Sequence, residues 1–386
     1  MQIDLFAPIS QYNVLTQFTY DLQKAMQRAH IDARLFDMRT ETEASLMQAY
    51  HSTIPDFTCG FNMVSSMPIP HITICVDWAT IHFPALLQCT NALIACTDKD
   101  VCDFLPQFGF NNTLWLPHAV SIEAMQDEHK LHEKRDLDIV CPMSFIDPNT
   151  ITEYWRAHFS PYLIDVLDGV VAACLSSATL SHPSALYQAL QNDSRAEEEI
   201  VATGIAAFDV INSIDRKLRA LDKICLLEAT HRPVHIFGHT DEHEKWKKTL
   251  PQKKNFIFHD AIPFDVLPDI LRRSKVVLSS VPMFKRSFHE RALMALGCGC
   301  SVITNKTDTL MAEFGCTKGI SYFLAPDYNA INTSIEAALS SEQDRLTAAY
   351  NARQIVLHKH TWDARVATLK EKLKKDNMFL FYLEAA

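Results

Sequence analysis

Short apolar runs alternate with longer segments of helical periodicity in the first third of the chain. Residues 3–7 form a strand-like apolar run, and residues 13–29 then carry apolar side chains at helical spacing. Further strand-like runs follow at residues 33–36, 57–62, 71–76, 92–97 and 113–116. Strands that alternate with helices predict parallel βαβ units with right-handed crossovers. We therefore expect an open α/β domain over residues 1–122.

A second series of strands begins after a charged, apolar-poor stretch, residues 123–137, which we interpret as a linker. This series opens with a run at 138–143, and nearly all of residues 151–228 then has helical periodicity. Strand–helix alternation resumes with runs at 234–237, 255–258, 276–279 and 301–304. The pattern predicts a second α/β domain over residues 138–355, with residues 151–228 as a helical insertion.

The last part of the chain has the pattern of an amphipathic helix up to about residue 375, followed by an apolar end at residues 378–383. Such an apolar end needs a surface to cover it. We therefore expect residues 356–386 to form a C-terminal helix that bridges back to the first domain.

Length and charge narrow the classes of function. A chain of 386 residues suits two domains better than one core. The formal net charge of −10 argues against a nucleic-acid partner, because such binding rests on neutralising many phosphates. No stretch approaches the roughly 20 apolar residues of a membrane span, and the N-terminus lacks the pattern of a signal peptide. These features predict a cytoplasmic protein with no integral membrane segment.

Cysteine usage agrees with a reducing compartment. The eleven cysteines are an odd number scattered through apolar contexts, which favours buried, reduced thiols. Cys298 and Cys300 form the one tight pair, and no further Cys or His lies nearby in sequence to complete a tetrahedral zinc site. We expect no metal ion and no cofactor.

Ligands of open parallel sheets bind beyond the carboxyl ends of the strands, so the loops after the strands of the second domain are the first candidates. One group of candidate residues comes from four of these loops: Ser144, Gly238, His239, Asp260, Ile262, Ser280 and Pro282. A second group opens the predicted helix 287–296: Lys285, Arg286, Ser287, Phe288, His289, Glu290 and Arg291. A helix N-terminus flanked by cations attracts a diphosphate. The alternative is local, because Ser287 and Glu290 have the spacing of a capping box.

The sequence of this second domain resembles a known family. Residues 255–263, 267–271, 274–279 and 289–299 are similar, in order and spacing, to the donor domain of glycosyltransferases of the CgeB (spore maturation protein) type. The resemblance implies the GT-B fold, in which two Rossmann-like domains face a cleft. It also implies a nucleoside-diphosphate sugar as donor, with nucleobase contacts at 260–263 and sugar and diphosphate contacts at 280–283 and 285–290.

Two departures from the family pattern keep other functions open. Met294 stands where many relatives have a glutamate for the ribose, and Ala261 stands where glycine is usual. A non-catalytic nucleotide-sugar-binding or interaction protein is therefore an alternative to a transferase. A nucleotide-sugar 2-epimerase is another alternative, although it needs several carboxylates around the sugar and only Glu290 is suitably placed.

Candidates for the chemical step lie in the first domain. Asp77 closes an apolar strand and suits a general base or a residue that orients His82; a loop aspartate that caps the next helix is the alternative. His118 ends another strand next to the expected linker. Tyr12 and Asn13 follow the first strand and are candidates for acceptor contacts, or for a turn and a helix cap. The acceptor itself, a glycan, lipid or protein, is not identified by the sequence.

Overall fold

The computed structural model describes residues 2–65, 69–78, 82–86, 92–125, 134–252, 254–315 and 319–375. Most of the expected linker and the apolar end at 378–383 lie outside these residues. The chain divides into two compact units. Unit 1 comprises residues 1–127, 263–267 and 355–386, and unit 2 comprises residues 128–262 and 268–354. Unit 1 is thus assembled from three separate segments of the chain. The domain boundaries expected from the sequence stay a prediction.

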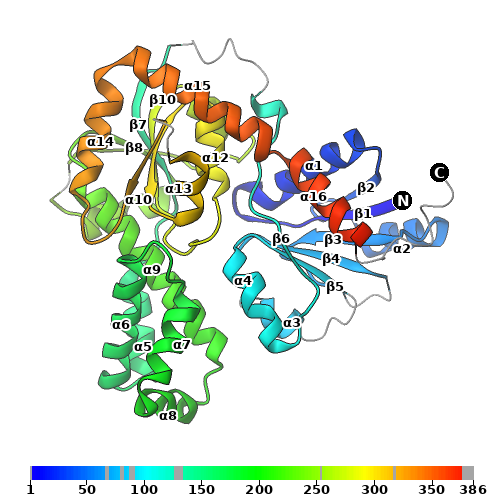
Figure 1. The fold of residues 1–386 in the computed structure, drawn as a ribbon, viewed down its shortest axis with the longest axis horizontal. Helices are drawn as coiled ribbons and strands as arrows, with labels where there is room; N and C mark the ends of the chain where they lie inside the picture. Colours follow the sequence, from blue (N-terminus) through cyan, green and yellow to red (C-terminus); the bar gives the residue numbers. More distant parts are fainter. Residues whose placement is uncertain are drawn as a thin grey trace. The chain divides into compact units, whose positions relative to one another are not determined.

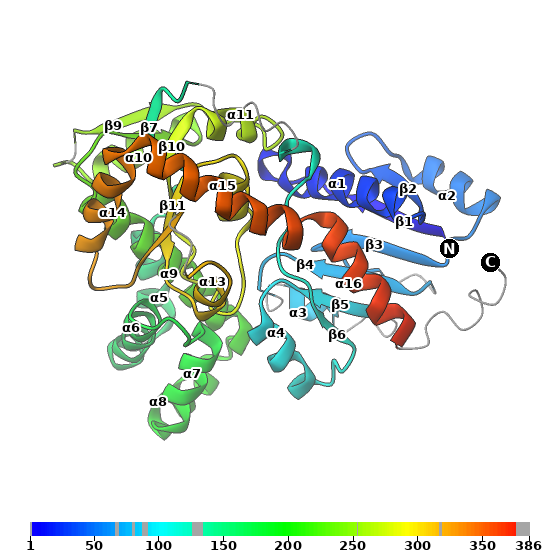
Figure 2. The ribbon, with the colours of Figure 1, turned by 45° about the horizontal axis from the view of Figure 1, so that its top comes forward.

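Unit 1 contains a parallel sheet of six strands in the order β2-β1-β3-β4-β5-β6 (Figure 1). Its strands are β1 (Gln2–Ala7), β2 (Asp32–Asp37), β3 (Phe57–Phe61), β4 (His71–Cys75), β5 (Ala92–Cys96) and β6 (Thr113–Trp115). Its helices include α1 (Val14–Arg28), α2 (Glu43–Ser52), α3 (Phe83–Leu86), α4 (Lys99–Phe104) and α16 (Trp362–Lys375). Helix α16 lies beside α1 (Figure 2), and Arg28 on α1 pairs with Asp363 on α16 at 2.7 Å.

Unit 2 contains a second parallel sheet of six strands, in the order β12-β11-β10-β7-β8-β9. Its strands are β7 (Leu137–Pro142), β8 (Val234–Phe237), β9 (Phe256–His259), β10 (Ser274–Ser279), β11 (Ser301–Asn305) and β12 (Ile320–Phe323). The helices that follow β8 are α10 (Thr240–Thr249), α11 (Leu267–Arg272), α12 (Glu290–Gly297), α13 (Asp308–Phe314), α14 (Asn329–Ser340) and α15 (Glu342–Lys359). The two sheets confirm the predicted pair of α/β domains. The sequence pattern missed β12, whose four residues alternate only weakly between apolar and polar positions.

Between β7 and β8 the chain forms helices α5 (Pro148–His158), α6 (Pro161–Leu175), α7 (His182–Gln191), α8 (Ser194–Thr203) and α9 (Ala207–Ala229). The first four pack against one another, and α5, α6 and α7 pack on α9 (Figure 1). Trp155 anchors this packing: it is fully buried, and its indole N–H donates to Ser213 Oγ at 2.9 Å. Removing a buried tryptophan typically costs about 3–5 kcal/mol, so this contact contributes much of the stability of the insertion.

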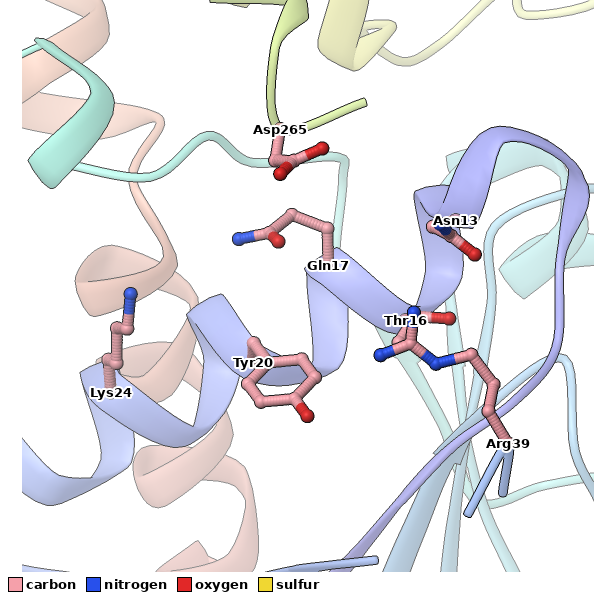
Figure 3. A pocket seen from close by; sticks show the side chains of 7 residues that line it. All are labelled: Asn13, Thr16, Gln17, Tyr20, Lys24, Arg39 and Asp265. Atoms are coloured by element: carbon pink, nitrogen blue, oxygen red, sulfur yellow. The ribbon is translucent and has the colours of Figure 1, made fainter. Parts of the chain in front are cut away.

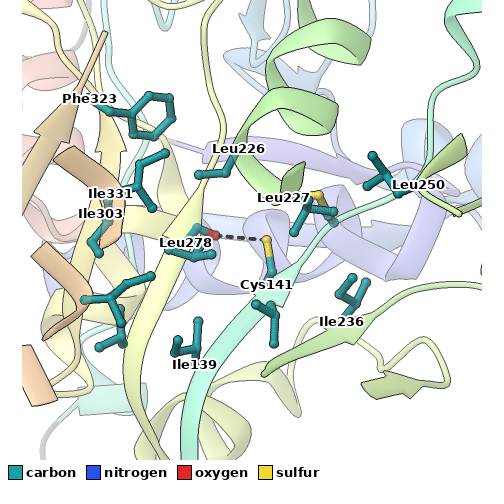
Figure 4. Close-up of a cluster of buried hydrophobic side chains, with 14 of the residues drawn as sticks. Ile139, Cys141, Leu226, Leu227, Ile236, Leu250, Leu278, Ile303, Phe323 and Ile331 are labelled. Atoms are coloured by element: carbon teal, nitrogen blue, oxygen red, sulfur yellow. Dashed lines mark hydrogen bonds between the residues drawn. The ribbon is translucent and has the colours of Figure 1, made fainter. Parts of the chain in front are cut away.

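The second half of α9 covers the sheet of unit 2. Leu226 and Leu227 are fully buried against side chains of β7, β8 and β10 (Figure 4). The central strand β7 also contributes Cys141, whose thiol donates to the Leu278 carbonyl at 3.4 Å. Burial of each leucine stabilises the fold by about 1.5–3 kcal/mol. The position of α9 is therefore set by its apolar stripe, and the charged residues that share this stripe are carried into the unit.

Among the described residues, no helix is long and apolar enough to span a bilayer. In the same part of the chain, no group of three or more His, Cys, Asp or Glu side chains is arranged to hold a metal ion.

Candidate functional site

Loops at the carboxyl ends of β7, β10 and β11 meet around helix α9. Asp222 on this helix is almost fully buried, and its carboxylate accepts hydrogen bonds from Ser280 Oγ at 2.6 Å and Asn305 Nδ2 at 3.0 Å. Tyr328 OH also donates to it, at 3.2 Å. Burial raises the pKa of Asp222, and the three donors oppose that rise. One carboxylate thus fixes the loops after β10 and β11 relative to the start of α14.

Lys223, the next residue, lies at the same edge of the sheet. Its ammonium donates to the carbonyl of Ser144, in the loop after β7, at 2.9 Å, and the side chain is 9% exposed. Burial, and after it the charges of Arg291 and Arg219, lower the pKa of Lys223 to about 7. Arg219 pairs with Asp215. Lys223 therefore links Ser144, a predicted donor residue, to a region influenced by the charges of two arginines.

Asp222 and Lys223 are not among the site residues expected from the sequence. The available signal was their spacing: they precede Leu226 and Leu227 by four residues, so a charged pair occupies an apolar helical stripe. Charged residues at core positions are uncommon unless they have partners or a function. The cations expected at a diphosphate site, Lys285, Arg286 and Arg291, did not include one from this helix, because the sequence does not show which helix packs at the strand ends.

Lys285 is buried, at 3% exposure, and contacts the insertion. Its ammonium donates to the carbonyls of Cys174 and Ser177 at 2.8 and 2.9 Å, at the end of α6. An ammonium has three donors, so two of them are engaged by the end of a helix, where positive charge is favourable. Arg286 next to it is half-buried. The role of both residues in binding a diphosphate stays a prediction.

Helix α12 begins at Glu290, two to three residues later than expected. His289 is its N-cap, with extended backbone and ring Nδ1 3.3 Å from the backbone N of Arg291. The predicted capping box between Ser287 and Glu290 is therefore wrong. Glu290 instead lies 2.9 Å from His289 Nδ1, and Phe288 is buried against Phe314. Within the first turn, the N–H groups of Ala292 and Leu293 donate to the His289 carbonyl at 3.1 and 3.2 Å.

The remaining donor candidates are spread over the ends of β8, β9 and β10. The Gly238 N–H donates to the His259 carbonyl at 3.2 Å, and a Cβ on Gly238 would lie 3.1 Å from the Met143 carbonyl, so only glycine fits easily. His239 is the N-cap residue of α10. Asp260 is exposed and accepts from Thr240 Oγ1 at 2.7 Å. Ile262 is half-buried, whereas Ser280 and Pro282 are buried in the loop after β10.

In unit 1, Asp77 lies at the carboxyl end of β4 and is held by the end of β3. Asn62 Nδ2 donates to Asp77 Oδ2 at 3.0 Å, and Asn62 Oδ1 accepts from the backbone N–H of Val76 at 2.9 Å. Burial lowers the pKa of His82, and the nearby charge of Asp77 opposes this shift. The roles of Asp77 and His82 in the chemical step stay a prediction.

His118 and the first-strand candidates have different surroundings. His118 is buried, with its ring edge-on to Phe18 at 5.9 Å, and its carbonyl accepts from Arg365 at 2.9 Å. Tyr12 and Asn13 both adopt left-handed backbone, with φ of 56° and 58°. Asn13 precedes α1 as its N-cap residue without a side-chain cap bond. Of these residues, Asn13 lines a pocket of about 270 Å³ on the surface of unit 1 (Figure 3).

Comparisons with known proteins agree with this arrangement. Residues 216–371 match a family described as glycosyl transferase-like. No curated protein matches the chain in sequence. The chain is similar in structure to sucrose-phosphate synthase from Thermosynechococcus elongatus, with TM-score 0.57 and 11% identity over 98% of this chain and 99% of that one. It is also similar to AviGT4, a glycosyltransferase of avilamycin A biosynthesis (TM-score 0.55, 8% identity, 97% of each chain).

A third similar structure is Anabaena HepE in complex with UDP and glucose, with TM-score 0.55 and 10% identity over 97% of this chain and 100% of that chain. At such low identities the structural likeness shows the fold, and the family match adds the type of domain that residues 216–371 form. Residues 216–371 thus form a glycosyl transferase-like domain, and the chain as a whole has the GT-B fold of these enzymes.

Proposed function

We propose that the protein is a glycosyltransferase that uses a nucleoside-diphosphate sugar, and that the diphosphate binds at the carboxyl edge of the unit 2 sheet. The observation that carries the proposal is the buried ammonium of Lys223, which lies 2.9 Å from the Ser144 carbonyl and is close enough to Arg219 and Arg291 to be influenced by their charges. Breaking the bond to the sugar leaves negative charge on the diphosphate, and fixed cations in a low-dielectric site stabilise such charge effectively. The UDP and glucose bound by HepE support a donor of this class.

The finer assignments rest on the sequence. Membership of the CgeB type is supported by the motifs within residues 255–299. A cytoplasmic location is supported by the cysteines of the described part, all of which are free thiols. We also propose transfer without a metal ion, because the cations and the helix N-terminus carry the charge that a metal would otherwise neutralise. The acceptor is a glycan, lipid or protein, and no nucleic acid takes part.

The test is calorimetric titration of UDP, GDP and ADP, and of the matching nucleosides, into the whole protein. For the diphosphate that binds, Lys223→Met should weaken affinity at least tenfold, while Lys223→Arg keeps it within about threefold. One unit charge pair at 4 Å and an effective dielectric constant of about 20 is worth about 4 kcal/mol before desolvation, which allows for such a loss. Nucleoside affinity should be unchanged in both variants.

A Lys285→Ala, Arg286→Ala double variant tells whether the loop before α12 adds to the same site, as the sequence predicts. A tenfold loss in the double variant alone would assign the diphosphate to that loop and contradict the role of Lys223. If none of these variants changes diphosphate affinity, the proposed donor site is wrong.

A further inference from the structure

The pocket on unit 1 is built on one face of α1. Five of its lining residues lie at positions 13, 16, 17, 20 and 24, the spacing of a single helical face. Arg39, from the loop after β2, and Asp265 complete the lining (Figure 3). The segment that carries Asp265 is fixed to unit 1, because the Phe264 N–H donates to the Tyr12 carbonyl at 3.0 Å. The Phe264 ring also packs edge-on against Phe18, with centroids 5.3 Å apart.

The aromatic and cationic groups of the pocket are held in place. Arg39 is bound by Asp37, through Nε to Oδ1 at 2.9 Å and Nη2 to Oδ2 at 2.5 Å. Tyr20 OH donates to the same carboxylate at 3.0 Å. Arg39 is the main cause that lowers the pKa of Asp37 to about 2. The guanidinium is therefore already neutralised by a carboxylate and serves as an oriented donor more than as a net positive charge.

Other lining groups present acceptors. Gln17 Nε2 donates to Asp21 Oδ1 at 2.9 Å, which orients its amide and leaves Oε1 to accept. The Thr16 hydroxyl donates its proton to the Pro8 carbonyl at 2.7 Å, so the lone pairs of Oγ1 can still accept hydrogen bonds. Asp265 is exposed and anionic, and Lys24 is exposed and cationic. A complementary ligand must both donate and accept hydrogen bonds at neighbouring positions, as hydroxyl groups do.

Charge and polarity narrow the ligand further. The charges of Lys24 and Arg39 are balanced by those of Asp37 and Asp265, so the pocket has no surplus positive charge to select an anion. Among the described residues, none that lines the pocket has an aliphatic side chain against which a lipid tail would pack. The volume of about 270 Å³ is at the small end of ligand pockets. These properties fit one small, neutral polyol ring beside the Tyr20 side chain.

We propose that this pocket binds a neutral carbohydrate unit of the acceptor, which makes the acceptor a glycan or a glycan-bearing molecule. The inference rests on the proposed transfer function, but it involves residues of unit 1 only. Asn13, a candidate acceptor residue from the sequence, belongs to the site; its partners Thr16, Gln17 and Tyr20 extend it along α1.

Saturation-transfer difference NMR tests the proposal with the whole protein. The probes are methyl glucoside, methyl galactoside, maltose, cellobiose and lactose at millimolar concentration, compared with glucose 6-phosphate and glucuronate. At least one neutral sugar should give a saturation-transfer difference signal. Gln17→Ala and Asp265→Ala should each reduce this signal at least threefold. Gln27→Ala is the matched control, since Gln27 is exposed on the same helix outside the pocket lining, and it should leave the signal unchanged.

The proposal is overturned if no neutral sugar of this set binds, if binding is equal in Gln17→Ala and Gln27→Ala, or if the charged sugars bind in preference. Diphosphate titration of the same variants separates this result from the donor site. If Gln17→Ala loses sugar binding but still binds the diphosphate, the pocket is supported as a sugar-binding site that is separate from the donor site. Failure of diphosphate binding in the unchanged protein would count against the proposed function alone.

Discussion

At the scale of single residues, burial decides which charged group is available for chemistry. Asp77 is only half-buried at the end of β4, and one hydrogen bond from Asn62 holds its carboxylate. Half-burial leaves part of this residue accessible to solvent, from where an acceptor hydroxyl can approach it. His118, by contrast, is buried next to Phe18. The surroundings therefore favour Asp77, coupled to His82, as the base that activates the acceptor.

Replacing Asp77 by asparagine should lower turnover by about 10²-fold or more, the usual scale for loss of a general base. Donor affinity should change little. Release of nucleoside diphosphate is measured with the preferred donor and an acceptor that supports turnover. Asp32→Asn is the control, because Asp32 is an exposed aspartate of the same unit. If turnover is unaltered in Asp77→Asn, His82 becomes the candidate base.

At the scale of elements, α9 joins the core to the donor site. Leu226 and Leu227 fix the helix on the sheet, and the turn before them carries Asp222 and Lys223 to the strand ends. The strands themselves were predictable, because buried parallel strands are short, nearly continuous apolar runs. The contribution of α9 was not predictable, because it depends on which helix covers which strands, and periodicity does not contain that information.

Asp222→Ala should reduce the free energy of unfolding by about 4.5 kcal/mol or more, the lower limit for the loss of three hydrogen bonds to a charged group. The substitution leaves the donors of Ser280, Asn305 and Tyr328 without their common acceptor, and hydrogen bonds to a charged group contribute about 1.5–3 kcal/mol each. Urea unfolding followed by circular dichroism measures the change. Glu228→Ala, at an exposed position of the same helix, should cost less than about 0.5 kcal/mol. If the two variants unfold at the same urea concentration, Asp222 does not stabilise the fold in the way described.

At the scale of the whole molecule, each unit buries a histidine that resists protonation. Burial, and after it the charges of Arg219 and Lys285, lower the pKa of His182 in unit 2 to about 3. Burial also lowers the pKa of His360 in unit 1 to about 3. In the unfolded chain a histidine takes up its proton near pH 6.5. The native state is therefore favoured above pH 6.5 and loses stability as the pH falls from there towards 3.

Below pH 6.5, each of the two histidines should lower the free energy of unfolding by about 1.4 kcal/mol for every pH unit that the pH falls. The free energy of unfolding is expected to be higher at pH 7.5 than at pH 5. His182→Gln should make this difference about 2 kcal/mol smaller, because glutamine does not titrate. Urea unfolding at both pH values gives this difference. His231→Gln serves as control, since His231 is exposed in the same unit. An unchanged pH dependence in His182→Gln would show that His182 is not protonated on unfolding.

The division of unit 1 into three segments has a consequence for synthesis on the ribosome. Arg365 on α16 donates to the carbonyls of Pro117 and His118, and Trp362 packs on Phe18 and Phe61, so the earliest strands and helices need residues near the end of the chain. Unit 2, from residue 128 to 354 apart from five residues, emerges as a nearly uninterrupted stretch. Domains generally fold as units while the chain grows. The first unit to be translated is therefore the last to be completed, and its apolar face on α1 stays uncovered until α16 has left the exit tunnel.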